Sequence, residues 1–222
     1  MDSLSGQVMD ISEEEREQIA VNDSLIALRR KLKHQTAEIG IIGLGYVGLP
    51  LGLLFSRKRF RTSGFDIDSG KVEKLRRGES YIKHIPSQMV AEQIEQRRFL
   101  PRSDFAGLRD MDAIIICVPT PLDKHHEPDL SFVRNTAAEV GLHLRRGQLV
   151  VLESTTYPGT TEEELIPILQ NSGLHCLVSK YSTDGRNVTA GEIAPAEFFL
   201  AFSPEREDPG DKQFQIMKSP RW

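Results

Sequence analysis

The sequence predicts an α/β fold in which helices cover both faces of a doubly wound, mainly parallel sheet, with a helical extension at the N-terminus. Short apolar runs alternate with helical patterns along residues 38–202, and this alternation predicts right-handed crossovers between parallel strands. The run IIICV, residues 114–118, is apolar at every position, as expected for a central strand buried on both faces. A glycine-rich turn follows the first apolar run directly.

The expected elements follow from these patterns in chain order. Residues 12–33 predict a helix, because Ser12 and Glu15 form a capping-box pattern before a patchy apolar stripe. Its polarity suggests an appended helix, used for packing or for an oligomer contact. Residues 179–196 are polar and turn-rich, which predicts a loop before the last strand. The expected strands are 39–42, 62–66, 113–118, 148–152, 174–178 and 198–202, and the other expected helices are 46–58, 69–76, 87–97, 130–144 and 160–170.

The composition is that of an ordinary globular protein. Hydrophobic residues make up 39% and charged residues 27% of the 222 positions, so a sizeable core is expected. The net charge of −4 gives no basic bias toward nucleic acid or anionic membranes. No run has the length of a membrane span, and the first 36 residues lack the apolar core of a signal peptide. We therefore expect a soluble cytoplasmic protein without a metal site.

The stretch IGIIGLGYVGLPLG, residues 39–52, fits a strand that delivers the chain to a phosphate. In this interpretation Gly43 permits the tight turn, Gly45 lets the backbone approach a pyrophosphate, and Gly48 lets helix and strand pack closely. The helix that follows presents unpaired N–H groups and the positive end of its dipole. A GxGxxG pattern alone is weak, since glycines also cluster in structural turns. The surrounding strand–turn–helix–strand unit predicts a Rossmann-like dinucleotide site.

The second strand supports this interpretation, because RTSGF is followed directly by Asp66, 23 residues after Gly43. A carboxylate at this position accepts both hydroxyls of an adenosine ribose and repels a 2′-phosphate, which favours NAD over NADP. Arg59 and Arg61 lie on the approach to the strand and not after it. Asp68 is the competing candidate, since an aspartate also caps the next helix.

Five motifs in order, GLGYVGLPLG, GFDID, IIICVPTPL, ESTTYPGTT and FLAFSPEREDPG, resemble the NAD domain of the UDP-glucose/GDP-mannose dehydrogenase family over residues 36–214. Members of that family oxidise the C6 alcohol of a nucleotide sugar to a carboxylate with two NAD⁺, a step that serves polysaccharide biosynthesis. The resemblance implies NAD as the cofactor and a UDP-sugar as the substrate. A homo-oligomer is a separate expectation, since the 12–33 helix fits an oligomer contact. It also implies that residues 37–205 form the NAD-binding domain, between an extension (1–36) and a tail (206–222).

The resemblance assigns roles to residues of this chain. Asp66 would meet the adenosine ribose with Lys71 nearby, and Thr155 would lie near the nicotinamide and the reacting carbon. From its residues alone, Thr155 is equally a turn hydroxyl that caps the helix starting near Thr160. The residues expected to bind the cofactor are Gly43, Gly45, Tyr46, Val47, Gly48, Asp66, Lys71, Pro119, Thr120 and Thr155.

The motif SPEREDPG concerns the substrate. By resemblance, Glu205 assists proton transfer and thioester hydrolysis, and Arg206 contacts the substrate. Enzymes that take UDP-glucose tend to carry a second glutamate four positions after Glu205, where this chain has Pro209. The pattern therefore resembles the branch that acts on UDP-N-acetylmannosamine or UDP-N-acetylglucosamine. Without the resemblance, these charged residues before Pro-Gly also fit a solvated turn.

The family's nucleophilic cysteine stands in a Gly-Gly-His-Cys segment, and this sequence contains none. Cys117 and Cys176 lie in apolar strand-like runs, so buried hydrophobic roles are expected ahead of a disulfide or a reactive thiol. The family's central helix and UDP-binding domain also have no counterpart here. We therefore expect the front half of a dehydrogenase that binds NAD, or alternatively a non-catalytic binding or interaction module.

Overall fold

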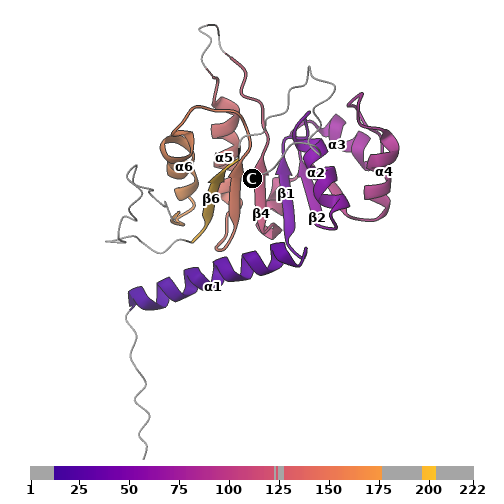
Figure 1. The fold of residues 1–222 in the computed structure, drawn as a ribbon. Coiled ribbons are helices and arrows are strands. Elements are labelled where there is room, and N and C mark those ends of the chain that lie inside the picture. Colours follow the sequence, from indigo (N-terminus) through magenta and orange to yellow (C-terminus); the bar gives the residue numbers. More distant parts are fainter. Residues whose placement is uncertain (1–12, 123, 125–127, 177–196, 204–222) are drawn as a thin grey trace, which may run out of the picture.

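The chain folds around one six-stranded parallel sheet with strand order β3-β2-β1-β4-β5-β6 (Figure 1). A computed structural model describes residues 13–122, 124, 128–176 and 197–203. The chain winds outward from β1 in one direction through β2 and β3, and then from β4 in the other direction through β5 and β6. The strands are β1 (Glu38–Ile42), β2 (Arg61–Phe65), β3 (Phe99–Arg102), β4 (Ala113–Ile116), β5 (Leu149–Leu152) and β6 (Phe199–Phe202).

Helices cover both faces of this sheet, as the doubly wound prediction requires, and the predicted fold class is confirmed (Figure 1). On β4, Ile114 and Ile116 pack toward α5 and α6, whereas Ala113 and Ile115 pack toward α2 and α4. This alternation explains why the run IIICV is apolar throughout. The helices are α1 (Glu13–Lys33), α2 (Gly48–Arg57), α3 (Ser69–Arg76), α4 (Ser87–Glu95), the 3₁₀ helix η1 (Phe105–Asp110), α5 (Ser131–His143), the π-helical η2 (Thr161–Leu165) and α6 (Ile166–Gln170).

Strand β3 was not predicted from the sequence, because FLPR contains a proline and only two consecutive apolar residues. β3 pairs with β2 alone at the edge of the sheet, where the missing N–H of Pro101 is tolerated. Of the strand predicted at 174–178, Cys176 forms an isolated parallel bridge to Phe198. Leu174 and His175 are described and belong to no strand. Residues 177–178, the predicted loop 179–196 and Ser12 of the capping box lie outside the described residues.

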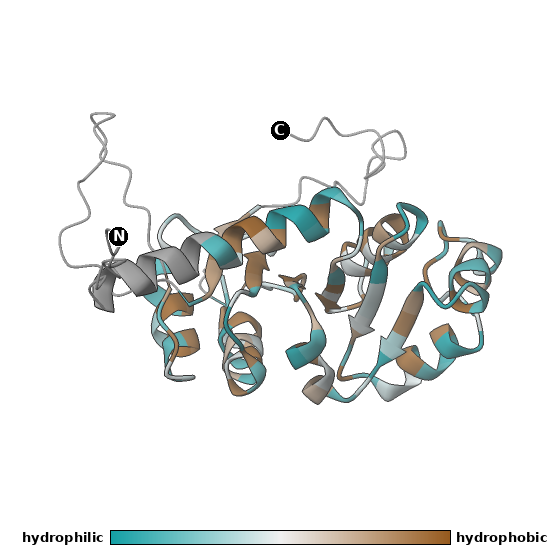
Figure 2. Cartoon of the chain, turned by 90° about the horizontal axis from the view of Figure 1, so that it is seen from below, coloured by the Kyte–Doolittle hydropathy of each residue, from teal (hydrophilic) through white to brown (hydrophobic). Residues whose placement is uncertain are grey.

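Helix α1 runs beneath the amino ends of the strands, apart from the helices that cover the sheet faces (Figure 1; seen from below in Figure 2). Leu28 is its buried contact, only 5% exposed, while Leu25 and Ile26 are exposed. Among the described residues, none of the helices combines the length and hydrophobicity that a membrane span requires.

Asp112 anchors α1 to the sheet. Its carboxylate accepts hydrogen bonds from the Lys31 ammonium of α1 at 2.7 Å, from the Glu38 N–H of β1 at 3.0 Å and from Arg145 at 3.2 Å. Burial alone would raise the pKa of Asp112, but these three hydrogen bonds together lower it below its usual value. One buried carboxylate thus joins three separate parts of the chain.

Asp112→Asn is expected to lower the free energy of unfolding by about 1–3 kcal/mol at pH 7, because three donors lose a charged acceptor that is itself buried. The pKa of Asp112 is lower in the folded than in the unfolded state. Its contribution is therefore present above about pH 4 and is lost as the pH falls through the folded pKa. Urea titrations at pH 7 and pH 3 measure this, and the difference between wild type and variant should shrink at pH 3. An equal difference at both pH values would contradict the assignment.

Candidate functional site

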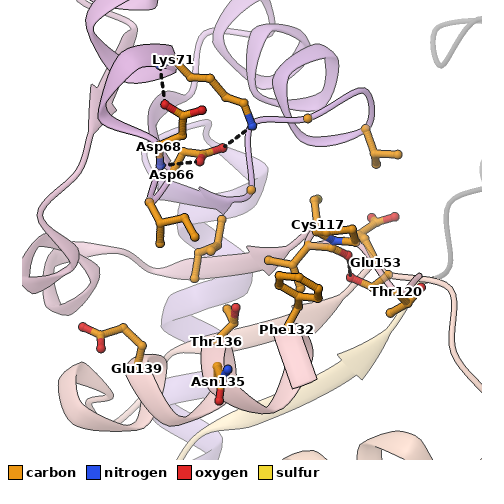
Figure 3. Close-up of a pocket in the computed structure, with 18 of the residues that line it drawn as sticks. Asp66, Asp68, Lys71, Cys117, Thr120, Phe132, Asn135, Thr136, Glu139 and Glu153 are labelled. Carbon is orange, nitrogen blue, oxygen red and sulfur yellow. Dashed lines mark hydrogen bonds and ion pairs between the residues drawn. The ribbon is translucent and has the colours of Figure 1, made fainter. Parts of the chain in front are cut away.

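A cleft of about 1160 Å³ opens at the carboxyl ends of β1, β2, β4 and β5, where the strand order reverses (Figure 3). Open α/β sheets bind ligands at this point, because the loops that leave neighbouring strands diverge there. The cleft is large enough for a dinucleotide by comparison with ordinary ligand pockets, which reach about 1,000 Å³. It is lined by these predicted cofactor residues: Gly43, Gly45, Tyr46, Val47, Asp66, Lys71, Pro119, Thr120 and Thr155.

The three glycines of the turn have different physical reasons to be glycine. Gly43 has φ +90°, and a Cβ there would lie 2.7 Å from the Cys117 carbonyl oxygen. Gly48 lies beneath the cleft, and its Cβ would lie 1.8 Å from the Gly43 carbonyl oxygen. A Cβ on Gly45 would meet nothing within 4 Å, although Gly45 lines the cleft. The fold itself requires Gly43 and Gly48, whereas Gly45 leaves space that a phosphate can occupy.

Helix α2 begins directly after this turn with its amino end uncapped. Val47 is the N-cap residue and makes no side-chain cap hydrogen bond, and the first turn carries no acidic residue. The Leu49 N–H already donates to the Gly45 carbonyl oxygen at 3.1 Å, and Pro50 has no N–H. The Gly48 N–H and the positive end of the helix dipole therefore suit an anion. Together with the space beside Gly45, this arrangement fits the pyrophosphate of a dinucleotide.

Asp66 supports the turn as well as lining the cleft. It is only 7% exposed, and its two oxygens accept hydrogen bonds from the Leu44 and Asp68 N–H groups, each at 2.9 Å. The Lys71 ammonium lies 3.8 Å from Oδ2 (Figure 3). Because each carboxylate oxygen has two lone pairs, both keep one direction for a hydroxyl donor. Arg61 lies at the opposite end of β2, where it pairs with Glu38 at 3.0 Å.

Asp68 has the role that the sequence offered as the competing one. Its carboxylate accepts hydrogen bonds from the Gly70 N–H at 2.9 Å and the Lys71 N–H at 3.2 Å, which makes it the N-cap of α3. The two aspartates of GFDID thus have different roles, since Asp68 caps α3 and Asp66 holds the glycine turn.

The loops after β4 and β5 form the other end of the cleft. The Thr120 hydroxyl donates to the Thr155 carbonyl oxygen at 2.8 Å, and the Ser154 hydroxyl donates to the Val118 carbonyl oxygen at 2.7 Å. The Thr155 residue is exposed toward the cleft. Thr160 is the N-cap residue of η2, but no side chain makes a capping hydrogen bond there. The Thr160 hydroxyl instead donates to the Tyr157 carbonyl oxygen at 2.7 Å. The capping role considered for Thr155 is therefore not the one at the start of this helix.

The two cysteines occupy different environments. Cys117 is half-buried and lines the cleft beside the glycine turn, in contrast to the buried role expected from its apolar run. Cys176 is buried, and burial raises the pKa of its thiol to about 11. A thiol with this pKa is almost entirely protonated at pH 7, which makes Cys176 a poor nucleophile.

One side of the cleft, formed by α5, was not predicted from the sequence. Asn135, Thr136 and Glu139 of α5 lie across from Asp66 and Lys71 (Figure 3). Helix 130–144 was predicted, but its periodicity does not tell which of its polar residues face a ligand. Other lining residues that were not anticipated are Ile67, Ser103, Phe105, Phe132, Glu153 and Ser154. Glu205 and Arg206 lie outside the described residues.

The chain is similar to known proteins of one family. Residues 37–222 match the NAD binding domain of the UDP-glucose/GDP-mannose dehydrogenase family. The UDP-N-acetyl-D-glucosamine 6-dehydrogenase of Pseudomonas aeruginosa is 36% identical over 81% of this chain and 37% of the relative. The UDP-N-acetyl-D-mannosamine dehydrogenase of Escherichia coli K12 is 33% identical over 83% of this chain and 41% of the relative. The chain thus spans about two fifths of the curated relatives' length.

Solved structures agree with these matches. The UDP-D-ManNAc dehydrogenase of Pyrococcus horikoshii superposes with a TM-score of 0.65 at 30% identity, covering 78% of this chain and 37% of the other. The NDP-N-acetyl-D-galactosaminuronic acid dehydrogenase of Methanosarcina mazei gives 0.66 at 31% identity, covering 82% and 37%. The predicted resemblance and the predicted cofactor, NAD, are both confirmed. The chain belongs to the UDP-glucose/GDP-mannose dehydrogenase family and comprises its NAD binding domain.

Proposed function

We propose that this chain is the NAD-binding part of a nucleotide-sugar 6-dehydrogenase that oxidises the C6 alcohol of a UDP-N-acetylhexosamine to a carboxylate. The observation that carries the proposal is the cleft, because predicted cofactor residues from four strand ends line it together. The choice of sugar is supported by the named relatives, which act on UDP-N-acetyl-D-glucosamine and UDP-N-acetyl-D-mannosamine. The Glu205-Arg206 pattern of the sequence supports the same branch.

In this proposal the residues of the chain bind and orient, and NAD⁺, when bound, supplies the hydride acceptor. Gly45, Val47 and the amino end of α2 hold the pyrophosphate, with Tyr46 beside them. Asp66 accepts the ribose hydroxyls and repels a 2′-phosphate, which selects NAD over NADP. The Lys71 ammonium lies 3.8 Å from this carboxylate and lines the same part of the cleft.

The loops after β4 and β5 serve the reacting end. The hydrogen bond from Thr120 to the Thr155 carbonyl fixes the backbone at Thr155, whose hydroxyl then orients a water or a substrate oxygen. Pro119 stiffens the same loop, since its ring fixes φ. Glu205 assists proton transfer and Arg206 contacts the nucleotide sugar.

The proposal includes the chain's organisation and setting. Residues 1–36 form an extension, 37–205 the NAD-binding domain and 206–222 a tail. Exposed Leu25 and Ile26 on α1 support a contact in a homo-oligomer. The net charge of −4 supports a small-molecule substrate over nucleic acid or a membrane, and the cytoplasm is the compartment that supplies both NAD and UDP-sugars.

A second candidate function is an NAD-binding module without turnover. It is favoured by one observation, namely that the 222-residue sequence contains no Gly-Gly-His-Cys segment. Within the family's chemistry, a thiolate captures the aldehyde before the second oxidation, so a chain without that segment lacks the nucleophile.

The 222-residue chain is expected to bind NAD⁺ and to form no NADH from UDP-N-acetylmannosamine or UDP-N-acetylglucosamine. Calorimetry measures the binding and absorbance at the NADH wavelength measures the turnover. Saturable NAD⁺ binding shows that an inactive sample is folded. Robust turnover would contradict the need for the cysteine, and the absence of NAD⁺ binding would contradict the proposed role of the cleft.

A further inference from the structure

Residues 79–86, in the segment between α3 and α4, pack against the glycine turn. The Tyr81 hydroxyl donates a hydrogen bond to the Leu44 carbonyl oxygen, 37 residues earlier in the chain. The His84 ring stacks on the Tyr46 ring with a centroid distance of 6.0 Å. Two side chains of this segment therefore contact the turn that the cofactor's pyrophosphate is proposed to meet.

This segment is built as a fixed support. Ile82 and Ile85 are buried in the same hydrophobic core as Leu44. The Ser80 N–H donates to the Ser87 hydroxyl at 2.9 Å, and the Ser80 hydroxyl donates to the Ile82 carbonyl at 3.2 Å. Because the segment is anchored on both sides of Tyr81, the phenol cannot drift away from the turn without breaking these contacts.

Both backbone groups of Leu44 form hydrogen bonds with side chains from other segments. Asp66 accepts the Leu44 N–H, and Tyr81 donates to the Leu44 carbonyl. The Lys71 ammonium joins these two partners, at 3.8 Å from Asp66 Oδ2 and 6.0 Å from the centroid of the Tyr81 ring. Burial, and then the charges of Asp66 and Asp68, raise the pKa of Tyr81, so its hydroxyl remains a donor at neutral pH.

In a trans peptide the carbonyl and the next N–H point in opposite directions. Holding the Leu44 carbonyl therefore also fixes the direction of the Gly45 N–H. Gly45 lines the cleft and has open space beside it, whereas Tyr81 is not among the described residues that line the cleft. The phenol thus holds the carbonyl end of a peptide group whose N–H belongs to Gly45, a residue that lines the cleft.

We propose that Tyr81 is a positioning residue for cofactor binding, whose hydroxyl aims the Gly45 N–H at the pyrophosphate by holding the Leu44 carbonyl. The inference rests on the proposed role of the cleft in binding NAD. A preorganised donor costs no ordering when the ligand arrives, so its loss should be felt only by ligands that carry the pyrophosphate.

The test is Tyr81→Phe in the 222-residue chain, since this change removes the hydroxyl and keeps the ring. Affinity for NAD⁺ and ADP should fall about three- to tenfold, as expected for one hydrogen bond, while affinity for adenosine stays within about twofold. Calorimetry measures the affinities for NAD⁺ and ADP, and an NMR titration measures the affinity for adenosine. Tyr157→Phe is the matched control. It removes a hydroxyl that donates to Glu164 at 3.3 Å and that belongs to a residue not among those described as lining the cleft, so it should change none of the three affinities.

Hydrogen exchange provides a second measurement that needs no ligand. In Tyr81→Phe the Leu44 amide, which donates to buried Asp66, should exchange faster, while amides in the middle of α5 keep their rates. An equal loss for adenosine and ADP would mean a merely structural role and would overturn the proposal, as would unchanged affinities together with unchanged Leu44 exchange. Failure of the wild-type chain to bind NAD⁺ would instead contradict the proposed function of the cleft.

Discussion

Gly48→Ala is expected to lower the free energy of unfolding by about 3 kcal/mol, as overpacking against fixed atoms does. The added Cβ would lie 1.8 Å from the Gly43 carbonyl oxygen, which is backbone and cannot rotate away. Alanine is a better helix former than glycine by up to about 1 kcal/mol, but this gain is smaller than the cost of the clash. Urea denaturation followed by circular dichroism measures the loss, and a stability equal to that of the wild type would contradict this packing at the start of α2.

Gly45→Ala, at the preceding glycine of the turn, is the matched variant with the opposite expected pattern. Its Cβ would meet nothing within 4 Å, and Gly45 is not among the glycines with positive φ, so the folded chain should tolerate it. We expect the free energy of unfolding to change by less than about 0.5 kcal/mol, as at an uncrowded surface site. NAD⁺ affinity should nevertheless fall at least about tenfold, because the methyl group occupies the space for a phosphate.

Together the two variants separate folding from binding. The same denaturation experiment and NAD⁺ calorimetry are applied to both. If Gly45→Ala binds NAD⁺ as tightly as the wild type, the space beside Gly45 is not the phosphate site. If it unfolds as readily as Gly48→Ala, the turn has a packing contact there that the structure lacks.

Asp66→Ala is expected to weaken NAD⁺ binding by about 1–3 kcal/mol. The change removes the acceptor for the ribose hydroxyls and also the acceptor that holds the Leu44 N–H at 2.9 Å. Wild-type protein should prefer NAD⁺ to NADP⁺, and the variant should lose most of this preference because the negative charge that repels a 2′-phosphate is gone. Calorimetry with both cofactors measures the two effects.

Glu197→Ala is the matched control for this prediction. Glu197 also accepts a backbone N–H, that of His175 at 2.9 Å, and it lies just before β6, at the end of the sheet opposite the cleft. Its loss should lower the free energy of unfolding by about 1–3 kcal/mol and leave both cofactor affinities unchanged. Equal affinity of the wild type for NAD⁺ and NADP⁺ would refute the role given to Asp66.

Much of the fold was predictable because its signals are local. The apolar runs around β1, β2, β4, β5 and β6, and the helical periodicity between them, are properties of short windows of sequence. β3 was not predictable in this way, since FLPR carries a proline and is accepted as a strand only because it pairs at the edge beside β2.

The same difference between local and long-range signals applies to the candidate site. GLGYVG and GFDID are contiguous motifs whose geometry follows from glycine conformations, a helix terminus and a strand end. The sequence could therefore predict the pyrophosphate turn and Asp66. It could not choose the face of α5 that meets the cleft, because Asn135, Thr136 and Glu139 carry no local pattern that separates them from other polar helix residues.

The sequence by itself determined the fold class, the phosphate turn and, through ordered motifs, the family and its cofactor. Only the tertiary structure decided which aspartate holds the turn and which caps α3, and which glycine leaves space for a ligand. Tyr81 also emerged only from the structure, since it meets Leu44 across 37 residues of chain. Contacts between distant segments depend on how whole elements pack, and no short window of sequence contains that information.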